Sequence, residues 1–260
     1  MKKDINGLSE QEFLRQYDAT SYERPSISID NLLFVINEIE NDDIRKLNEK
    51  RLQVLLIKRD SHPYLNQWSL PGAFVKMTET LEETSIKCLE DKANLSSSIY
   101  LEQLYTFGEV KRDPRTRVLS IAYMGLVDKK SVKIKEKSMN TSWFTLKILD
   151  GEILFEEDNG LIVRENDLAF DHAKIINYGL SRIKNKLEYT DIAFSLLGEE
   201  FTMAELQQVY EVLLDKRLTK ANFQRKIKDR VVSTGKYKTG GFRPALLYKY
   251  KGDVIWKFKV

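Results

Sequence analysis

The sequence predicts an α/β protein in which a mixed sheet with helices is followed by a small, basic helix-turn-helix domain. Three features predict it: short apolar runs typical of strands, one long helical pattern among them, and helical periodicity after the acidic segment at residues 156–160. With 260 residues, 42% of them hydrophobic and 31% charged, the chain can bury one sizeable core and a smaller one. We therefore expect one or two domains.

Three runs of β-branched and aliphatic residues predict strands, namely 26–36, 52–57 and 117–127. A helical pattern lies between them, from Leu81 to about Lys92, and Thr78 or Thr80 can cap its first turn. Residues 170–186 carry a second apolar stripe with helical spacing, which predicts a connecting helix.

The C-terminal region has the pattern of a helix-turn-helix followed by a hairpin. Thr202 and Glu205 form a T-x-x-E capping box, so a helix is expected to begin at about residue 202. A second helix is expected at about 219–231, and two short helices joined by a tight turn are typical of a helix-turn-helix. The turn Gly240-Gly241 between two strand-like segments then predicts a hairpin wing.

Composition excludes several classes of protein. No apolar run approaches the roughly 20 residues of a membrane span, and the N-terminus has no apolar signal segment. The single cysteine, Cys88, excludes an intramolecular disulfide, and only His62 and His172 could supply nitrogen ligands. The sequence therefore predicts a cytoplasmic protein with no membrane partner and no structural zinc.

Positive charge is concentrated at the C-terminal end. Residues 199–260 hold 14 Lys/Arg against 7 Asp/Glu, a net +7, whereas the rest of the chain carries −4. Arginine and asparagine can read base edges in a major groove, while lysine neutralises phosphate. The expected partner is double-stranded DNA, with a solvated basic surface, RNA or an acidic protein as the alternatives. The expected DNA-binding residues are Lys220, Asn222, Arg225, Lys226, Lys228 and Arg230 on the second helix and Lys236, Lys238 and Arg243 on the hairpin.

The segment WSLPGAFV at 68–75 and the helix after it resemble the Nudix box of pyrophosphohydrolases, G-x5-E-x7-R-E-U-x-E-E-x-G-U, where U is a large aliphatic residue. In this frame Ala73 stands at the first glycine and Glu79 at the first glutamate. The positions from the arginine onward are Lys87, Cys88, Leu89, Asp91, Lys92, Asn94 and Leu95.

In the Nudix enzymes three helix carboxylates one turn apart bind magnesium or manganese. Here a thiol (Cys88) and an ammonium (Lys92) replace two of them, and only Asp91 remains. The resemblance therefore implies a degenerate box without catalytic residues or a metal site. Lys87 and Lys92 can instead neutralise a bound pyrophosphate; the alternative is that Lys92 pairs with a nearby acid on the surface.

Further segments extend the resemblance from about Tyr22 to Tyr250. They are RDPRTRVLSIAYMGLV at 112–127, LAFDH at 168–172, FTMAELQQVYE, NFQRKI and GFRPALLYKY. Together they are similar to the NrtR-type Nudix-related transcriptional regulators. The resemblance implies a homodimeric repressor of NAD-metabolism genes that binds a DNA operator. Its non-catalytic Nudix-like domain would sense ADP-ribose or a related nucleotide as effector, with no cofactor required.

Within this resemblance, seven residues are expected to bind the ligand: Arg112, Asp113, Arg115, Lys92, Glu79, Ala73 and Phe74. Two guanidinium groups on the 112–115 loop provide bidentate recognition of an anion, although Asp113-Pro114 is also a common exposed turn. His172 is expected to be a structural residue that hydrogen-bonds at the start of the connecting helix.

The expected organisation is an N-terminal extension, a Nudix-like ligand-sensing domain, a connecting helix and a winged helix-turn-helix DNA-binding domain, at 1–21, 22–165, 166–190 and 191–260. Two further functions remain open: a hydrolase of ADP-ribose-type nucleotides with an atypical metal site, and a regulator that senses a sugar.

Overall fold

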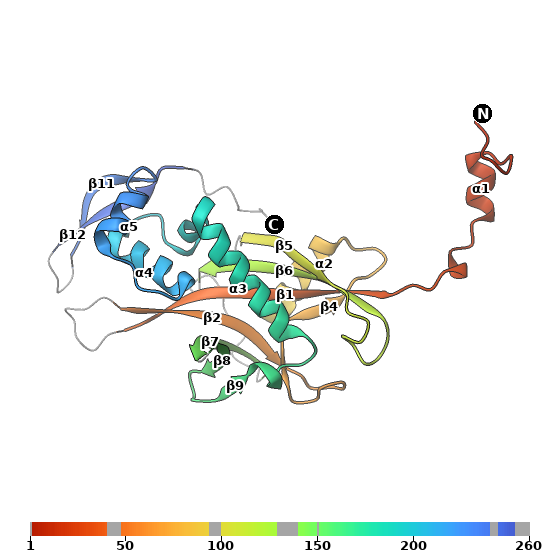
Figure 1. Ribbon diagram of the computed structural model, residues 1–260, viewed down its shortest axis with the longest axis horizontal. Helices are drawn as coiled ribbons and strands as arrows, with labels where there is room; N and C mark the ends of the chain where they lie inside the picture. The colour runs from red at the N-terminus through yellow and green to blue at the C-terminus, as the bar shows by residue number, and fades with distance from the viewer. Residues whose placement is uncertain are drawn as a thin grey trace.

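The computed structural model describes residues 2–40, 48–93, 100–128, 140–149, 151–239 and 244–252. The molecule is elongated, with the helix-turn-helix region at one end and the N-terminal helix α1 (Glu10–Gln16) at the other (Figure 1). Asn94, Leu95, the turn Gly240-Gly241 and Arg243 lie outside the described residues.

A mixed sheet forms the main body, as the sequence predicted. Within the described ranges its strand order is β5-β6-β1-β2-β7-β8-β9, with β3 paired to β2 and β4 paired to β1. Strands β1 and β6 pair in parallel, and the other strand pairs described in this sheet are antiparallel. The strands are β1 (Ser26–Ile39), β2 (Glu49–Lys58), β3 (Trp68–Ser69), β4 (Gly72–Phe74), β5 (Tyr100–Phe107), β6 (Val118–Asp128), β7 (Thr141–Leu149), β8 (Glu152–Glu157) and β9 (Ile162–Arg164).

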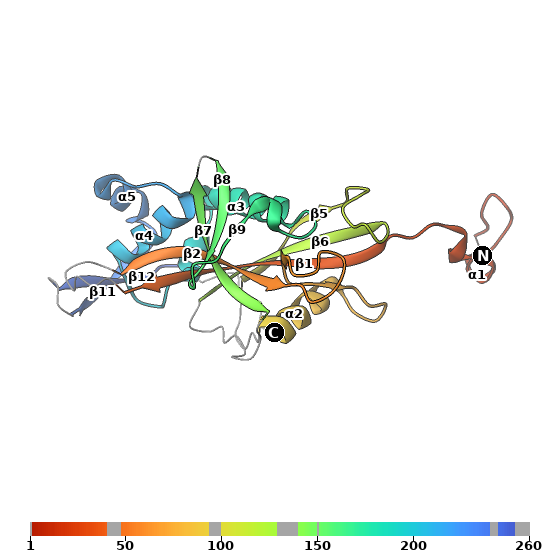
Figure 2. The ribbon, with the colours of Figure 1, turned by 90° about the horizontal axis from the view of Figure 1, so that it is seen from below.

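Helices α2 (Leu81–Ala93) and α3 (His172–Tyr189) cover opposite faces of this sheet (Figure 2). Successive side chains of a strand point to opposite faces, so β1 contributes to both layers. Leu32 and Phe34 belong to the core beneath α3, while Leu33 packs in the smaller core beneath α2. The layer under α3 continues into the C-terminal region, so one apolar core joins the sheet to the helix-turn-helix.

Local capping explains where the helices begin. Thr80 caps α2: its hydroxyl accepts from the Glu83 amide at 3.2 Å, and the Glu83 carboxylate accepts from the Thr80 amide at 2.8 Å. The connecting helix α3 starts at His172, two residues later than expected. Phe170 has φ +56°, a left-handed conformation that a helix interior does not allow.

The C-terminal region is a winged helix. Thr202 and Glu205 form the predicted capping box of the first helix. The elements are η4 (Ile192–Leu196), β10 (Phe201–Thr202), α4 (Met203–Leu214), α5 (Lys220–Ile227), β11 (Val231–Lys238) and β12 (Ala245–Tyr250). The hairpin β11/β12 and the short β10 form an antiparallel sheet in the order β10-β12-β11.

The second helix of the pair, α5, is shorter than predicted. It ends at Ile227, because the amide of Arg230 turns back to the Ile227 carbonyl at 2.8 Å and Val231 already pairs with Tyr250 in the hairpin. Two of the expected DNA-binding residues, Lys228 and Arg230, therefore lie in the turn after the helix.

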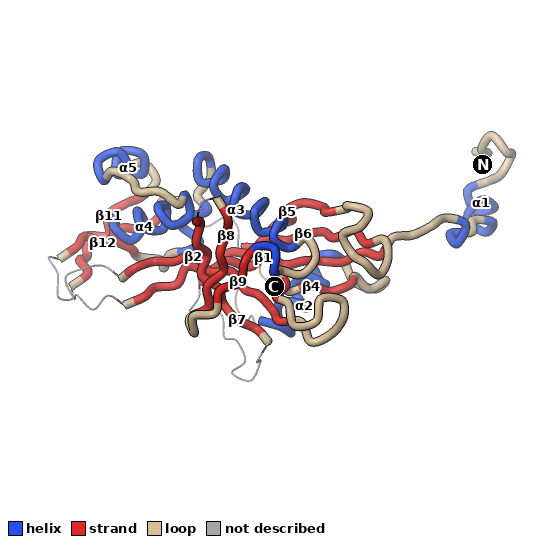
Figure 3. Tube along the Cα trace, turned by 60° about the horizontal axis from the view of Figure 1, so that its bottom comes forward, coloured by secondary structure: helices blue, strands red, loops and turns tan. Residues whose placement is uncertain are grey.

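The N-terminal arm stands away from the body of the molecule (Figure 3). It contains α1 and the 3-10 turn η1 (Ala19–Ser21), and no residue of either is buried. The 3-10 turn η3 (Glu165–Asp167) precedes α3. No helix in the described part of the chain is long and apolar enough to cross a membrane.

Candidate functional site

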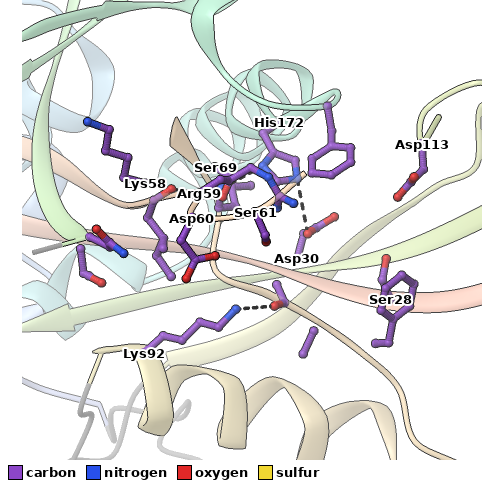
Figure 4. A pocket seen from close by; sticks show the side chains of 18 of the residues that line it. Ser28, Asp30, Lys58, Arg59, Asp60, Ser61, Ser69, Lys92, Asp113 and His172 are labelled. Carbon is purple, nitrogen blue, oxygen red and sulfur yellow. Dashed lines mark hydrogen bonds and ion pairs between the residues drawn. The ribbon is translucent and has the colours of Figure 1, made fainter. Parts of the chain in front are cut away.

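A cavity of about 420 Å³ opens where β1, β2, β4, the end of α2, the 112–115 loop and the start of α3 meet (Figure 4). Six of the seven residues expected to bind ligand lie in this region, and all six line the cavity; they are Ala73, Phe74, Lys92, Arg112, Asp113 and Arg115. Tertiary folding thus gathers the Nudix-box loop, the end of its helix and the distant RDPR segment around one space.

Asp30 forms the floor of the cavity and is 7% exposed. Its carboxylate pairs with Arg112 Nη2 at 3.1 Å and accepts from the Ser120 hydroxyl. It also faces His172 Nε2 at 3.5 Å (Figure 4). Burial by itself would raise the pKa of Asp30. Its contact with His172, followed by those with Ser120 and Arg112, nevertheless holds the pKa of Asp30 well below its usual range.

His172 is a structural residue at the start of α3, as the sequence predicted. Its Nδ1 accepts from the backbone amide of Leu70 at 2.8 Å. The neutral ring therefore carries its proton on Nε2, the nitrogen that faces Asp30. The imidazole connects the first residue of α3 to the cavity floor and to the strand segment before β4.

Arg112 is buried between two aspartates. Its guanidinium makes a bidentate pair with Asp171, with Nη2–Oδ1 at 2.6 Å and Nε–Oδ2 at 3.0 Å, besides its contact with Asp30. Burial alone would lower the pKa of Arg112, but the two carboxylates raise it. The sequence places Arg112 near the ligand's phosphates, with an exposed turn as the alternative. Arg112 lines the cavity, and its side chain is only 3% exposed and holds the loop to the start of α3.

The loop requires a glycine at position 72, not at position 73, where the Nudix box has its first glycine. A Cβ at Gly72 would lie 2.5 Å from Asp30 Oδ1 and 2.9 Å from the Ile29 carbonyl oxygen. Ala73 pairs with Ile29 across β4 and β1 without such a conflict. The Gly72 carbonyl accepts from Lys92 Nζ at 2.7 Å, which fixes the end of α2 against the loop (Figure 4).

Cations and aromatic rings surround the opening of the cavity. Arg115 makes a bidentate pair with Asp113 at 3.0 and 2.7 Å, and its guanidinium lies 5.2 Å from the centre of the Phe74 ring. Arg59 lies 4.9 Å from the ring of Phe170. Arg115 also lies 5.9 Å from the centre of the Phe170 ring, so both guanidinium groups border the same ring. Burial, followed by the charge of Arg115, lowers the pKa of Arg59.

Arg59 and Phe170 were not foreseen from the sequence. Arg59 follows a predicted strand, and Phe170 stands in the LAFDH segment used to identify the family, so both were visible as positions. Neither has a motif that assigns it to a pocket. Only the fold brings the residue after β2 and the residue before α3 together.

Glu79 is turned toward the helix rather than the cavity. Its carboxylate accepts from Lys87 at 3.0 Å, Lys76 at 3.3 Å and the Thr84 hydroxyl at 3.2 Å. The hydrogen bond from Lys87 is the largest effect that lowers the pKa of Glu79. Glu79 and Lys87 thus form an ion pair between the loop and α2, in the positions of the glutamate and arginine of the Nudix box.

The remaining positions of the box differ in their surroundings. Cys88 is 4% exposed and belongs to the core, and burial raises the pKa of its thiol. Asp91 and Lys92 line the cavity. Among the residues that the structure describes, no group of three or more His, Cys, Asp or Glu side chains could hold a metal ion.

The exposed face of α5 carries four of the expected DNA-binding residues, namely Lys220, Asn222, Arg225 and Lys226. Asn222 accepts a hydrogen bond from Arg225 at 3.0 Å, which orients the guanidinium. On β11, Lys236 pairs with Glu200 at 2.8 Å and Lys238 with Glu205 at 2.6 Å.

The two residues after α5 differ from each other. Lys228 is exposed, whereas Arg230 donates to the Asp191 carboxylate at 2.9 Å and to the Thr190 carbonyl at 3.2 Å. The guanidinium of Arg230 is therefore directed toward the end of α3, and 29% of the side chain remains exposed.

Known proteins resemble this chain in both regions, the one with the cavity and the winged helix. The family model of the NrtR DNA-binding winged helix domain matches residues 193–250. The "ADPR responsive transcriptional repressor NtrR" of Acinetobacter baylyi is 32% identical over 255 residues, which are 96% of this chain and 92% of that protein. An ADP-ribose pyrophosphatase of Methanocaldococcus jannaschii is 27% identical over 155 residues, 60% of this chain and 73% of the enzyme.

Solved structures show the same two-part architecture. A MutT/nudix family protein from Enterococcus faecalis has a TM-score of 0.73 at 26% identity, covering 94% of each chain. The NrtR of Shewanella oneidensis, solved in complex with a 27mer DNA, has a TM-score of 0.64 at 31% identity, covering 86% of this chain and 93% of that one. Identity over nearly the whole length, together with the matched winged helix, places this chain in the NrtR family of Nudix-related transcriptional regulators.

Proposed function

We propose that this protein is a transcriptional repressor of NAD-metabolism genes that binds operator DNA through its winged helix. Its Nudix-like domain senses ADP-ribose or a related nucleotide, which loosens DNA binding. The observation that carries the effector assignment is the charge of the cavity. Within the described residues, Arg59 and Lys92 hydrogen-bond to backbone carbonyls, those of Pro63 and Gly72, each at 2.7 Å. In the part of the chain that the structure describes, neither cation forms an ion pair with a carboxylate, so both can attract an anion.

The chemistry of ADP-ribose suits this arrangement. Its pyrophosphate carries two negative charges, which Lys92 and Arg59 can neutralise, and Arg115 can contribute a planar pair of donors. The Phe74 and Phe170 rings offer apolar faces against which an adenine can stack. The cavity of about 420 Å³ lies within the range of small-molecule sites.

We propose further that the site binds without hydrolysing. A divalent cation needs several hard oxygen ligands, and the three helix positions offer a buried thiol at Cys88, one carboxylate at Asp91 and an ammonium at Lys92. This donor set does not fit magnesium or manganese. The rival function is hydrolysis of an ADP-ribose-type nucleotide, and Asp91 at the cavity wall, with the pyrophosphatase relative, favours it.

On the DNA side, we propose that α5 enters the major groove. Lys220, Asn222, Arg225 and Lys226 are exposed there, and Lys228, Lys236 and Lys238 lie beside them in the turn and on the wing. Arg243, which lies outside the described residues, is proposed from the sequence alone. We leave Arg230 out of this set because its guanidinium is held by Asp191. We also propose a homodimer that binds two half-sites of a near-palindromic operator.

One experiment tests the regulator. Fluorescence anisotropy measures the affinity for duplexes from the promoter region next to its own gene, with and without ADP-ribose, NAD or a sugar. We expect ADP-ribose to weaken binding, with reciprocal weakening of ADP-ribose binding by the duplex. A DNA affinity unchanged by every ligand would overturn the sensor.

A turnover assay with ADP-ribose and magnesium distinguishes the rival hydrolase from a regulator that does not hydrolyse its ligand. We expect no release of ribose phosphate above the rate without protein. Release that disappears in Asp91→Asn would establish the enzyme instead.

A further inference from the structure

Both ends of α3 are held by an aspartate that precedes a helix but does not cap it. At the cavity end, Asp171 occupies the N-cap position of α3, yet its side chain makes no capping hydrogen bond. An N-cap aspartate ordinarily accepts from the first helical amides. The carboxylate of Asp171 is instead taken by the bidentate pair with Arg112, which also contacts Asp30 on the cavity floor.

The opposite end of α3 repeats this arrangement with different partners. Asp191 follows the last turn of α3, occupies the N-cap position of η4, and also makes no capping hydrogen bond. Its two oxygens accept from Arg230 at 2.9 Å and from the Tyr250 hydroxyl at 2.5 Å. Arg230 lies between α5 and β11, and Tyr250 ends β12, so this carboxylate joins α3 to both parts of the winged helix.

Between these ends α3 is a continuous helix of 18 residues, about 27 Å long. Figure 1 shows it crossing the sheet, with its C-terminal end beside the winged helix. Its middle touches β1 closely: a Cβ at Gly179 would lie 2.1 Å from a methyl carbon of Leu32. The middle of α3 is therefore packed tightly against β1.

We propose that α3 couples the effector cavity to the DNA-binding domain, and that Arg112 and Arg230 are the positioning residues at its two ends. The proposal rests on the proposed function, since it describes how an effector in the cavity alters DNA binding. Within the described part of the chain, Arg112 lines the cavity and Arg230 does not.

The physical step is a competition for one guanidinium. An anionic group of the effector that approaches Arg112 weakens its pair with Asp171, because the same N–H donors cannot satisfy both acceptors fully. Asp171 then gains the freedom to cap α3, and the start of the helix shifts. At the far end the Asp191 contacts with Arg230 and Tyr250 transmit that shift to the turn after α5 and to the hairpin. Ligand and DNA then favour different positions of one packed element.

The test measures coupling rather than binding. The affinity for operator DNA is determined with saturating ADP-ribose and without it, and the ratio of the two values is the coupling factor. We expect Asp191→Asn and Arg230→Gln to lower this factor at least fivefold toward one, while the affinity for ADP-ribose alone changes less than twofold. Arg230→Lys, which keeps the charge, should retain more of the coupling than Arg230→Gln.

Two more variants test the cavity end of α3 and provide a control on the same helix. Asp171→Asn, at a residue that does not line the cavity, should lower the coupling factor as the Asp191 variant does. Asn177→Ala is the matched control, because Asn177 is exposed on α3 and, among the described residues, its side chain hydrogen-bonds only to the Ala173 carbonyl of its own helix, at 3.2 Å. It should leave the factor unchanged.

Hydrogen exchange supplies a second measurement that does not depend on DNA. In the unaltered protein ADP-ribose should change the protection of residues 190–196 and 230–238, and in Asp191→Asn it should not. Variants that bind ADP-ribose and keep the full coupling factor would overturn the inference alone. A coupling factor of one in the unaltered protein would instead remove the proposed function, and this inference with it.

Discussion

The Nδ1 atom of His172 accepts a hydrogen bond from the backbone amide of Leu70 at 2.8 Å, while Nε2 of the same ring faces Asp30 at 3.5 Å. One imidazole thus satisfies a buried amide and a buried carboxylate. It does so at the point where the strand segment before β4, the strand β1 and the helix α3 meet, so the cavity floor depends on it.

We expect His172→Ala to lower the free energy of unfolding by about 2–4 kcal/mol, because the Leu70 amide and Asp30 both lose a partner in a buried site. His172→Asn, whose carboxamide can accept from the same amide, should cost less than half as much. Urea unfolding followed by circular dichroism measures both. Equal losses for the two variants would contradict the hydrogen-bonding role.

The lowered pKa of Asp30 predicts an acid-sensitive contribution to stability. The unfolded carboxyl titrates near its ordinary value of about 3.9, above its folded value, so the unfolded state binds more protons in the acid range. The stabilisation is complete above the unfolded pKa and is lost as the pH falls through and below it. Asp30→Asn removes this titration.

Urea midpoints measured between about pH 6 and about pH 3 test the prediction. We expect stability to fall less steeply with acid in Asp30→Asn than in the unaltered protein. Other acids with lowered pKa values, such as Glu205, are present in both proteins and cancel in the comparison. Parallel curves would show that Asp30 does not contribute in this range.

Lys92→Ala is expected to weaken ADP-ribose binding by about 1.5–3 kcal/mol, roughly 10- to 150-fold, because an ammonium at the cavity wall no longer meets the pyrophosphate. Stability should change by less than about 0.5 kcal/mol, since the side chain is exposed. Isothermal titration calorimetry measures the affinity.

The control for this variant is Lys111→Ala. It removes the same charge from an exposed position beside the 112–115 loop that does not line the cavity. Equal affinity losses in the two variants would indicate a general field effect rather than a contact by Lys92.

Arg225→Ala is expected to reduce operator affinity by about 1–3 kcal/mol, roughly 5- to 150-fold, and to relax the sequence preference, as the loss of one bidentate base contact does. Lys236→Ala should instead weaken binding to all duplexes alike and make the salt dependence less steep. Anisotropy titrations over a range of salt concentrations distinguish them. An unchanged preference in Arg225→Ala would remove the base contact.

The sequence by itself determined the kinds of element and their order. The strands at 26–36, 52–57 and 117–127 and the T-x-x-E capping box were recognisable because they depend on neighbours within a few residues. It also identified the family, since the RDPR segment and the winged-helix segments are local motifs. Element ends were less certain: α3 begins late at a left-handed Phe170, and α5 ends early where the hairpin pairing begins.

Tertiary structure decided which partner each charged side chain has. Arg112 and Arg230 were read from their motifs as ligand-facing and DNA-facing residues, yet each is held by an aspartate at one end of α3. Those aspartates lie 59 and 39 residues away in the chain. A guanidinium on a basic segment has the same local pattern whether it faces solvent or a distant carboxylate. Only the folded chain brings that carboxylate within hydrogen-bonding distance, and so determines which of the two the arginine meets.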